Sequence, residues 1–417
     1  MGQDKTARFP EGFLWGAATS AHQVEGMNTA SDWWAWEQEE IRKSQPKIKA
    51  VSGNACDHYN RFDGDFALAE RLGHNAHRFG IEWARIQPHE GEWSMDAVAH
   101  YKKVFASLRE HKLEPFVTMY HFTLPQWVAE RGGWLNPRIV KWFRAYAEFL
   151  AEQFGEDAKF WVTMNEPLVL VDSGFRRGVW APGRPHGLLG TIRSFWNMRS
   201  AHRAAYGAIR KKAKEVGVSV SAGVVHNLTA FEAYDSRNIG DRICAAALNF
   251  VLVRLYLRLF GKPADFLGVN FYFKTRSHFD IRHPQEMLWG CTDETEPRSD
   301  MGWAIRPDGI ATVLRAASSV GVPIYITENG IADKDDVQRA DFIIKHLRHV
   351  HETIAAGVDV RGYFYWSLLD NFEWAWGFEP RFGLCEVNYG DFSRTPRKSA
   401  FVYEHIARNN SLEESLI

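Results

Sequence analysis

Two glutamates stand where short apolar runs of the chain end. Glu166 follows the run 160–165, and Glu328 closes the run 323–328; each lies beside an asparagine. Two carboxyl groups in one site suit the cleavage of glycosidic bonds, because one can protonate the leaving oxygen. The other either attacks the anomeric carbon, at a separation of ~5–5.5 Å, or activates water, at ~6.5–9.5 Å. The sequence leaves both geometries open, but it marks Glu166 and Glu328 as candidate catalytic residues.

Short apolar runs alternate with amphipathic stretches along the whole chain. The runs predict eight strands, and the stretches between them have helical periodicity. Such alternation favours an α/β fold, a (β/α)8 TIM barrel, in which catalytic groups lie at the carboxyl ends of the strands. A doubly wound open sheet is the alternative, but the chain has neither GxGxxG nor GxxxxGK[ST]. The predicted strands are 13–19, 76–83, 115–121, 160–165, 219–226, 266–272, 323–328 and 361–367, and the predicted helices include 63–72, 97–110, 137–154, 199–215, 310–319 and 342–356.

The composition is that of an ordinary globular protein with a sizeable core. Net charge is −1 over 417 residues, which argues against nucleic acid as a partner. We find no low-complexity linker or short repeat and predict one catalytic domain over 1–417. Four scattered cysteines (Cys56, Cys244, Cys291 and Cys385) and an N-terminus without an apolar leader predict a cytoplasmic protein. We expect no transmembrane segment; the apolar stretch 245–260 comes closest and is expected to be a buried helix, with a lipid-facing surface as the alternative.

Aromatic residues make up 14% of the chain, and 17 of them are tryptophans. Most such rings fill cores, but an indole can also stack on the apolar C–H face of a pyranose. No histidine or cysteine spacing typical of a metal site is present, and His346, His349 and His351 do not share one helix face. We therefore expect that helix to be solvated, and we predict no metal and no cofactor.

The chain resembles glycoside hydrolase family 1, the retaining β-glucosidase and β-galactosidase group. The matching motifs occur in family order along nearly the whole sequence, which is more specific than any of them alone. They are 9–20 (FPEGFLWGAATS), 165–167 (NEP), 327–330 (TENG), 367–375 (SLLDNFEWA) and 381–384 (RFGL).

The resemblance implies a role for each matching position. Glu166 would be the general acid/base and Glu328 the nucleophile, with Arg78, Tyr272 and Asn270 near them. Asn165 would hold the 2-hydroxyl of the sugar. The remaining implied contacts are Gln23 and His121 to the 3- and 4-hydroxyls, Glu373 to the 4- and 6-hydroxyls, Trp366 as a stacking floor and Trp374 as a side wall.

Departures from the family pattern affect specificity more than catalysis. Phe122 stands where members often have tryptophan, so the preference among glucose, galactose and fucose stays open. Leu168 replaces another frequent tryptophan, which suggests an aliphatic aglycone side. Glu373 would repel a sugar phosphate, so unphosphorylated glycosides are expected.

Three functions of different classes follow. The first is an exo-acting, retaining β-glucosidase with β-galactosidase and β-fucosidase side activity, acting on small β-linked glycosides or short oligosaccharides. The second is a transglycosylating β-glycosyltransferase with a galactolipid-type acceptor, suggested by likeness around 80–83 to a plastid galactosyltransferase of this fold. The third is a carbohydrate-binding protein on an inactive barrel, which would need neither glutamate. Oligomeric state stays open.

Overall fold

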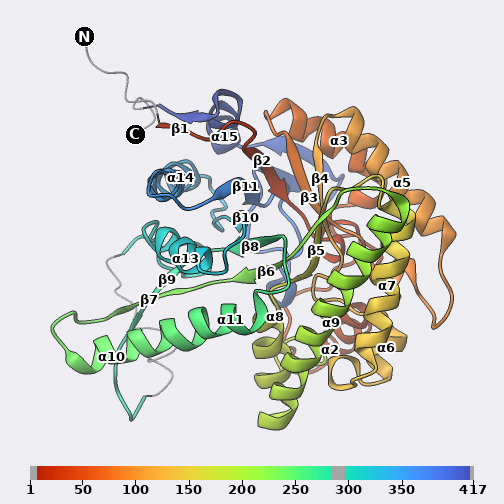
Figure 1. Cartoon of the computed structure of the whole chain (residues 1–417), viewed down its shortest axis with the longest axis horizontal. Coiled ribbons are helices and arrows are strands. Elements are labelled where there is room, and N and C mark those ends of the chain that lie inside the picture. Colours follow the sequence, from red (N-terminus) through yellow and green to blue (C-terminus); the bar gives the residue numbers. More distant parts are fainter. Residues whose placement is uncertain (1–6, 284–295, 414–417) are drawn as a thin grey trace.

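Eight parallel strands close into a barrel in the computed structural model, which describes residues 7–283 and 296–413 (Figure 1). This confirms the predicted TIM barrel, and each predicted strand overlaps an observed one. Around the barrel the strand order is β10-β11-β2-β3-β4-β5-β6-β8. The strands are β2 (Leu14–Ala18), β3 (Ala76–Gly80), β4 (Glu114–Thr118), β5 (Phe160–Asn165), β6 (Ser221–Asn227), β8 (Phe266–Asn270), β10 (Ile324–Asn329) and β11 (Val360–Trp366).

Most barrel strands are buried on both faces, because the helices cover the outside and side chains fill the inside. This explains why they read as continuous apolar runs rather than as alternating ones. Several predicted runs were too long at the carboxyl end. The run 76–83, for instance, ends as a strand at Gly80, and the Glu82 side chain then caps the next helix by accepting from the Ala84 N–H.

Helices follow the strands and form the outer layer (Figure 1). All six predicted helices are confirmed, the longest beginning twelve residues earlier than predicted, at Gly187 instead of 199. The observed helices are α1 (Ala21–Val24), α2 (Asp32–Glu40), α3 (His58–Arg71), α4 (Trp83–Ile86), α5 (Met95–Glu110), α6 (Gln126–Glu130), η1 (Gly133–Leu135), α7 (Ile139–Phe154), α8 (Pro167–Leu170), η2 (Val171–Arg176), α9 (Gly187–Val216), α10 (Ile239–Leu248), η3 (Asn249–Leu255), α11 (Tyr256–Phe260), α13 (Gly309–Ser318), α14 (Arg339–Ala355), η4 (Trp374–Trp376) and α15 (Lys398–Asn409).

Helix α7 illustrates how the outer layer attaches to the barrel. Its buried residues Phe143, Ala147, Leu150 and Phe154 recur at three- and four-residue spacing, which places them on one face. That face is turned toward the core, and α7 also packs along α9. The periodicity that predicts the helix is thus the same feature that fixes its orientation.

Outside the barrel, the described part of the chain forms three two-stranded sheets. They pair β1 (Ala7–Arg8) with β14 (Ser411–Leu412), β12 (Cys385–Asn388) with β13 (Ser393–Pro396), and β7 (Ala230–Ala233) with β9 (Lys274–Ser277). The first pair brings the two ends of the described chain together. Cys56 and Cys385 are buried free thiols, and Cys291 lies outside the described residues.

The apolar stretch 245–260 belongs to a continuous helical segment, α10–η3–α11, which spans Ile239–Phe260. By length and composition alone this segment could cross a membrane. Only 33% of its most apolar stretch is buried inside the protein. The prediction of a buried helix is therefore wrong for most of it. Composition indicated apolar character correctly but could not indicate which side of the helix the barrel would cover.

Candidate active site

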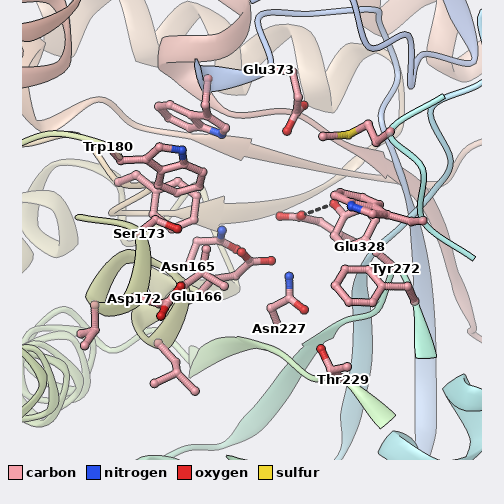
Figure 2. A pocket seen from close by; sticks show the side chains of 18 of the residues that line it. Asn165, Glu166, Asp172, Ser173, Trp180, Asn227, Thr229, Tyr272, Glu328 and Glu373 are labelled. Carbon is pink, nitrogen blue, oxygen red and sulfur yellow. Dashed lines mark hydrogen bonds between the residues drawn. The ribbon is translucent and has the colours of Figure 1, made fainter. Parts of the chain in front are cut away.

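Glu166 stands at the turn between β5 and α8. Its backbone is left-handed (φ 44°, ψ 58°), and Pro167 begins the helix directly after it. The Glu166 N–H donates to the Val225 carbonyl on the neighbouring strand, at 2.9 Å. A sharp turn fixed in this way directs the buried carboxyl group into the mouth of the barrel, where Figure 2 shows it facing Glu328.

Glu328 lies near the end of β10 and is held at both carboxylate oxygens. Arg78 Nη1 donates to Oε1, and the Tyr272 hydroxyl donates to Oε2, each at 2.6 Å. Both glutamate and arginine are almost fully buried. Charge-assisted hydrogen bonds of this length are strong and directional, so the carboxylate has one defined orientation.

Arg78 and two asparagines link the two glutamates behind the pocket wall. Arg78 Nη2 donates to Asn165 Oδ1 at 2.6 Å, and Asn270 Nδ2 donates to the same oxygen at 3.2 Å. Asn270 Nδ2 also donates to Glu166 Oε1, at 2.6 Å. Asn270, expected near the nucleophile, thus also holds the carboxyl group on the opposite side of the site, and its own oxygen accepts from the Thr327 hydroxyl at 2.7 Å.

Burial acts on both carboxyl groups, but their neighbours differ. Burial, followed by repulsion from Glu328, raises the pKa of Glu166 to about 8. Burial also raises the pKa of Glu328, while the Arg78 cation and the hydrogen bond from Tyr272 act in the opposite direction. Since the cation is bonded to Glu328, we assign the shared proton to Glu166 and the negative charge to Glu328.

A third carboxyl group, that of the half-buried Glu373, lies across the pocket (Figure 2). Its pKa is raised to about 8 by burial and by Glu328, with hydrogen bonds from Trp366 and Gln23 opposing the shift. The Gln23 amide reaches it at 3.4 Å and is anchored by donating to the Phe372 carbonyl at 2.8 Å. Gln23 and Glu373 thus form one polar wall.

Aromatic rings and His121 form another wall. The ring of His121 lies nearly parallel to those of Trp366 and Trp374, each with centroids 6.0 Å away. Burial and the Arg78 cation hold the pKa of His121 well below its usual range, so the imidazole is neutral. Its Nε2 lies 3.2 Å from Asn165 Nδ2, which leaves Nδ1 without a hydrogen-bond partner among the described residues.

These walls enclose a cavity of about 580 Å³. The structure brings every predicted site residue to it: Arg78 and Asn270 lie behind the wall, and the others line it directly. The lining residues among them are Gln23, His121, Asn165, Glu166, Tyr272, Glu328, Trp366, Glu373 and Trp374. Phe122 and Leu168, the two departures from the family pattern, line the cavity as well.

Several lining residues were missed by the sequence analysis. Trp180 packs against Phe122 and Trp374, with ring centroids at 5.1 and 5.8 Å, and comes from a loop after η2 that has no periodicity. Asn227 could have been found, because it ends a barrel strand as Asn165 and Asn270 do. Its side chain is hydrogen-bonded to Glu166. Others missed are Asp172, Ser173, Arg176, Arg177, Thr229, Phe231, Leu252, Met301, Trp303, Trp376 and Phe382.

Within residues 7–283 and 296–413, no group of histidine, cysteine and acidic side chains could hold a metal ion. His346 is buried, with its Nδ1 2.8 Å from the Phe342 carbonyl. The expectation of a solvated helix is therefore wrong for this histidine, which packs between the helix and Phe271.

Comparison with known proteins identifies the family of the chain. The family model described as glycosyl hydrolase family 1 matches residues 5–256 and 254–412. Beta-glucosidase A of Thermotoga maritima is 33% identical, over 98% of this chain and 99% of that protein. A beta-galactosidase of Pyrococcus woesei is 32% identical, over 98% of both.

Solved structures give the same result. A beta-glycosidase from Pyrococcus horikoshii superposes with a TM-score of 0.87 at 37% identity, covering 99% of this chain and 97% of that one. The beta-glucosidase of Thermotoga maritima in complex with glucoimidazole has a TM-score of 0.87 at 32% identity, with 97% and 100% covered. Together with the paired glutamates, these matches place the chain in glycosyl hydrolase family 1 as a β-glycosidase.

Proposed function

We propose that this protein is an exo-acting, retaining β-glycosidase that hydrolyses unphosphorylated β-D-glucosides by double displacement. The observation that carries the proposal is the unequal treatment of the two opposed carboxyl groups. Glu328 is bonded to Arg78 and Tyr272, whereas the pKa of Glu166 is raised to about 8. One group is thus ready to attack as an anion and the other to give up a proton.

In the first step, the Glu328 carboxylate attacks the anomeric carbon while Glu166 protonates the glycosidic oxygen. The bond to the aglycone breaks, the alcohol leaves, and a glycosyl ester with Glu328 remains. Arg78 and Tyr272 orient the carboxylate before this step. Because their bonds are preformed, little reorganisation is needed during the attack.

In the second step, Glu166 acts as a base. Formation of the ester removes the negative charge of Glu328, which is a cause of the raised pKa of Glu166. The ionised Glu166 then takes a proton from water, the water oxygen attacks the anomeric carbon, and the Glu328 carboxylate is released. The sugar leaves with its original β configuration, and both carboxyl groups return to their starting states.

The polar wall supports recognition of one terminal sugar. Gln23, Glu373 and the free Nδ1 of His121 present hydrogen-bonding atoms, and the Trp366 indole offers a face for the pyranose ring. Asn165, fixed by Arg78, is the group proposed to hold the 2-hydroxyl. Glu373 gives no positive charge for a phosphate in either protonation state, which favours unphosphorylated substrates. Galactosides and fucosides are proposed as side substrates, because Phe122 cannot donate a hydrogen bond to the sugar.

The test uses initial rates on nitrophenyl β-glucoside, β-galactoside and β-fucoside with wild type and Glu328→Ala. Wild type should turn over all three and favour the glucoside, and the variant should lose turnover. Azide added to the variant should restore it and give the α-glycosyl azide, because the small anion enters from the side vacated by the carboxylate. A β-azide or an absence of rescue would contradict the role of Glu328, and no turnover by folded wild type would contradict the function.

Two further predictions stay with this proposal. Residues 1–417 are proposed to act as one catalytic domain. Transglycosylation to a galactolipid-type acceptor uses the same two glutamates, and no observation favours it over hydrolysis. Product analysis with added galactolipid would separate the two, since a glycosyltransferase would form more glycosylated lipid than free sugar.

A further inference from the structure

One face of the α10–η3–α11 segment has none of the other described residues, 7–283 and 296–413, packed against it. Its exposed positions recur at three- and four-residue spacing, so they form a continuous stripe along the helix. Phe250 is 58% exposed and Ile243 is 64% exposed, and exposed apolar side chains gathered along one helix face are less common than scattered ones. We call these positions the α10 stripe; they are Ile239, Arg242, Ile243, Ala246, Ala247, Phe250, Val251, Arg254 and Arg258.

A second exposed apolar group lies on the first turns of α9. Leu189 is 83% exposed, and Leu188, Ile192 and Trp196 are exposed beside it. The two helices are in direct contact: Arg199 Nε donates to the Leu259 carbonyl at 2.5 Å, and the rings of Phe195 and Phe260 pack at 5.7 Å. The turns of α9 that carry Phe195 and Arg199 therefore meet the C-terminal end of the segment that bears the α10 stripe.

The active-site cavity opens between these two groups. Thr191 lines the cavity, while its neighbour Ile192 is exposed to solvent. On the other helix, Leu252 lines the cavity, while its neighbour Val251 is exposed. The exposed apolar residues thus form two sides of the rim through which a substrate enters.

The charges on this surface have one sign. The exposed charged residues of the α10 stripe are all arginines, and Arg193 is the exposed charge on the first turns of α9. The single acid within 239–260, Asp241, is buried and accepts hydrogen bonds from the backbone N–H groups of Asp235 and Phe279. An apolar strip flanked by arginines complements a surface that is apolar inside and anionic outside.

The opposite side of the helix excludes insertion across a membrane. Tyr256, Leu257 and Phe260 are buried in the protein core, so the segment cannot leave the fold without exposing them. A second copy of the chain is a poor occupant, because a symmetric contact would bring arginines together without an exposed acid of the same helix to pair with them.

We propose that the α10 stripe and the first turns of α9 bind peripherally to the surface of an anionic lipid bilayer. The helix lies in the plane of the interface, with Phe250, Ile243 and Leu189 among the acyl chains and the arginines at the phosphates. Binding in this orientation turns the mouth of the active-site cavity toward the lipid.

The experiment measures binding of the full-length protein to vesicles by flotation. Vesicles of phosphatidylcholine with phosphatidylglycerol should carry the wild type upward, and vesicles of phosphatidylcholine alone should carry much less. Phe250→Glu and Leu189→Glu should each lower the partition coefficient at least tenfold, because an apolar side chain that would enter the acyl chains is replaced by an anion. The matched control is Phe401→Glu, which changes a phenylalanine 54% exposed on α15, far from this surface in Figure 1.

A second set of variants tests the charges. It remains informative even if the glutamate variants of the apolar residues do not fold. Arg254→Gln and Arg258→Gln should each reduce binding about fivefold at low salt, and added salt should remove the difference. Turnover of nitrophenyl β-glucoside and the melting temperature serve as folding controls. Failure of wild type to bind anionic vesicles overturns the proposal. So does a loss of vesicle binding in Phe401→Glu as large as that in Phe250→Glu. A wild-type dimer that Phe250→Glu makes monomeric would assign the surface to a second copy and overturn it too.

Discussion

The two ends of the barrel interior are built from the same strands but are held together by different forces. At the amino end, four aromatic rings surround that of Phe116, whose centroid lies 5.0–5.3 Å from those of Phe160, Phe266, Tyr325 and Phe364. At the carboxyl end, the interior is a network of charged and amide groups. The amino end is stabilised by packing. At the carboxyl end, the burial of carboxyl groups lowers the stability of the fold.

The change from one end to the other takes only a few residues. On β4, Phe116 belongs to the ring cluster, and Thr118, two residues later on the same face, accepts from Arg78 Nε at 3.0 Å. On β8, Phe266 belongs to the cluster and Asn270 holds Glu166. We call the amino end of the barrel interior the packed end and the carboxyl end the chemical end. The strands run through both, so the packed end positions the side chains of the chemical end.

The largest effect should come from the chemical end. Glu328→Gln keeps the size of the side chain but removes the anion, so we expect kcat to fall by about 10⁴-fold or more, the scale seen when a covalent nucleophile is lost. The melting temperature should change much less than kcat, because relief from burying the carboxylate opposes the loss of the counter-charge of Arg78. Steady-state kinetics and thermal unfolding check both, with Glu156→Gln, exposed after α7, as control. A folded variant with near-normal kcat would contradict the division between the two ends.

The packed end should show the opposite pattern. Phe116→Ala removes a fully buried ring and should lower the free energy of unfolding by about 3–5 kcal/mol. Activity measured well below the melting temperature should change only severalfold, since Phe116 does not line the cavity. The control Phe401→Ala, on the surface, should cost far less. Denaturant titration compares the two; equal losses would show that the ring cluster contributes little.

Asn270 tests whether the network sets the ionisation of Glu166. Its amide favours the charged form of Glu166, so Asn270→Ala should raise the pKa of that carboxyl group further above 8. The alkaline fall of kcat/KM, expected near pH 8 in wild type, should therefore move to higher pH, and kcat should fall by about 10–100-fold through misplacement.

A matched control is available on the next strand. Asn329 also ends a barrel strand, but it donates to the Phe271 carbonyl and accepts from Tyr363 instead of contacting either carboxyl group. Asn329→Ala should leave the alkaline limb unmoved even if it lowers stability. If the alkaline fall of kcat/KM moved in both variants, the cause would be a general loosening of the barrel and not the loss of the hydrogen bond from Asn270 to Glu166.

How far the sequence could predict this site depends on the element that carries each residue. Glu166 and Glu328 were predictable because strand ends of a barrel must converge, and Arg78 was predictable only from the resemblance to the family. Trp180 was not, because its loop has no periodicity and its place depends on packing against Trp374. The segment 239–260 shows a different limit, since its apolar composition reads the same whether the protein covers one side of the helix or all of it.

The smallest predicted effect concerns the free energy of unfolding, which burial of Glu166 at the carboxyl end of the barrel lowers. The pKa of Glu166 is about 8 in the folded protein and starts from 4.5 in an unperturbed glutamate. Below pH 4.5 the group is neutral in both states and costs nothing. Between pH 4.5 and 8 the unfolded chain releases the proton while the folded protein keeps it, so folded stability falls as pH rises, and it levels off above 8.

Glu166→Gln removes this dependence and can still accept from Asn270. Its melting temperature should match that of wild type near pH 4.5 and exceed it increasingly up to pH 8. Thermal unfolding of both proteins across this range checks the trend, and a constant difference at every pH would mean that Glu166 does not carry this cost.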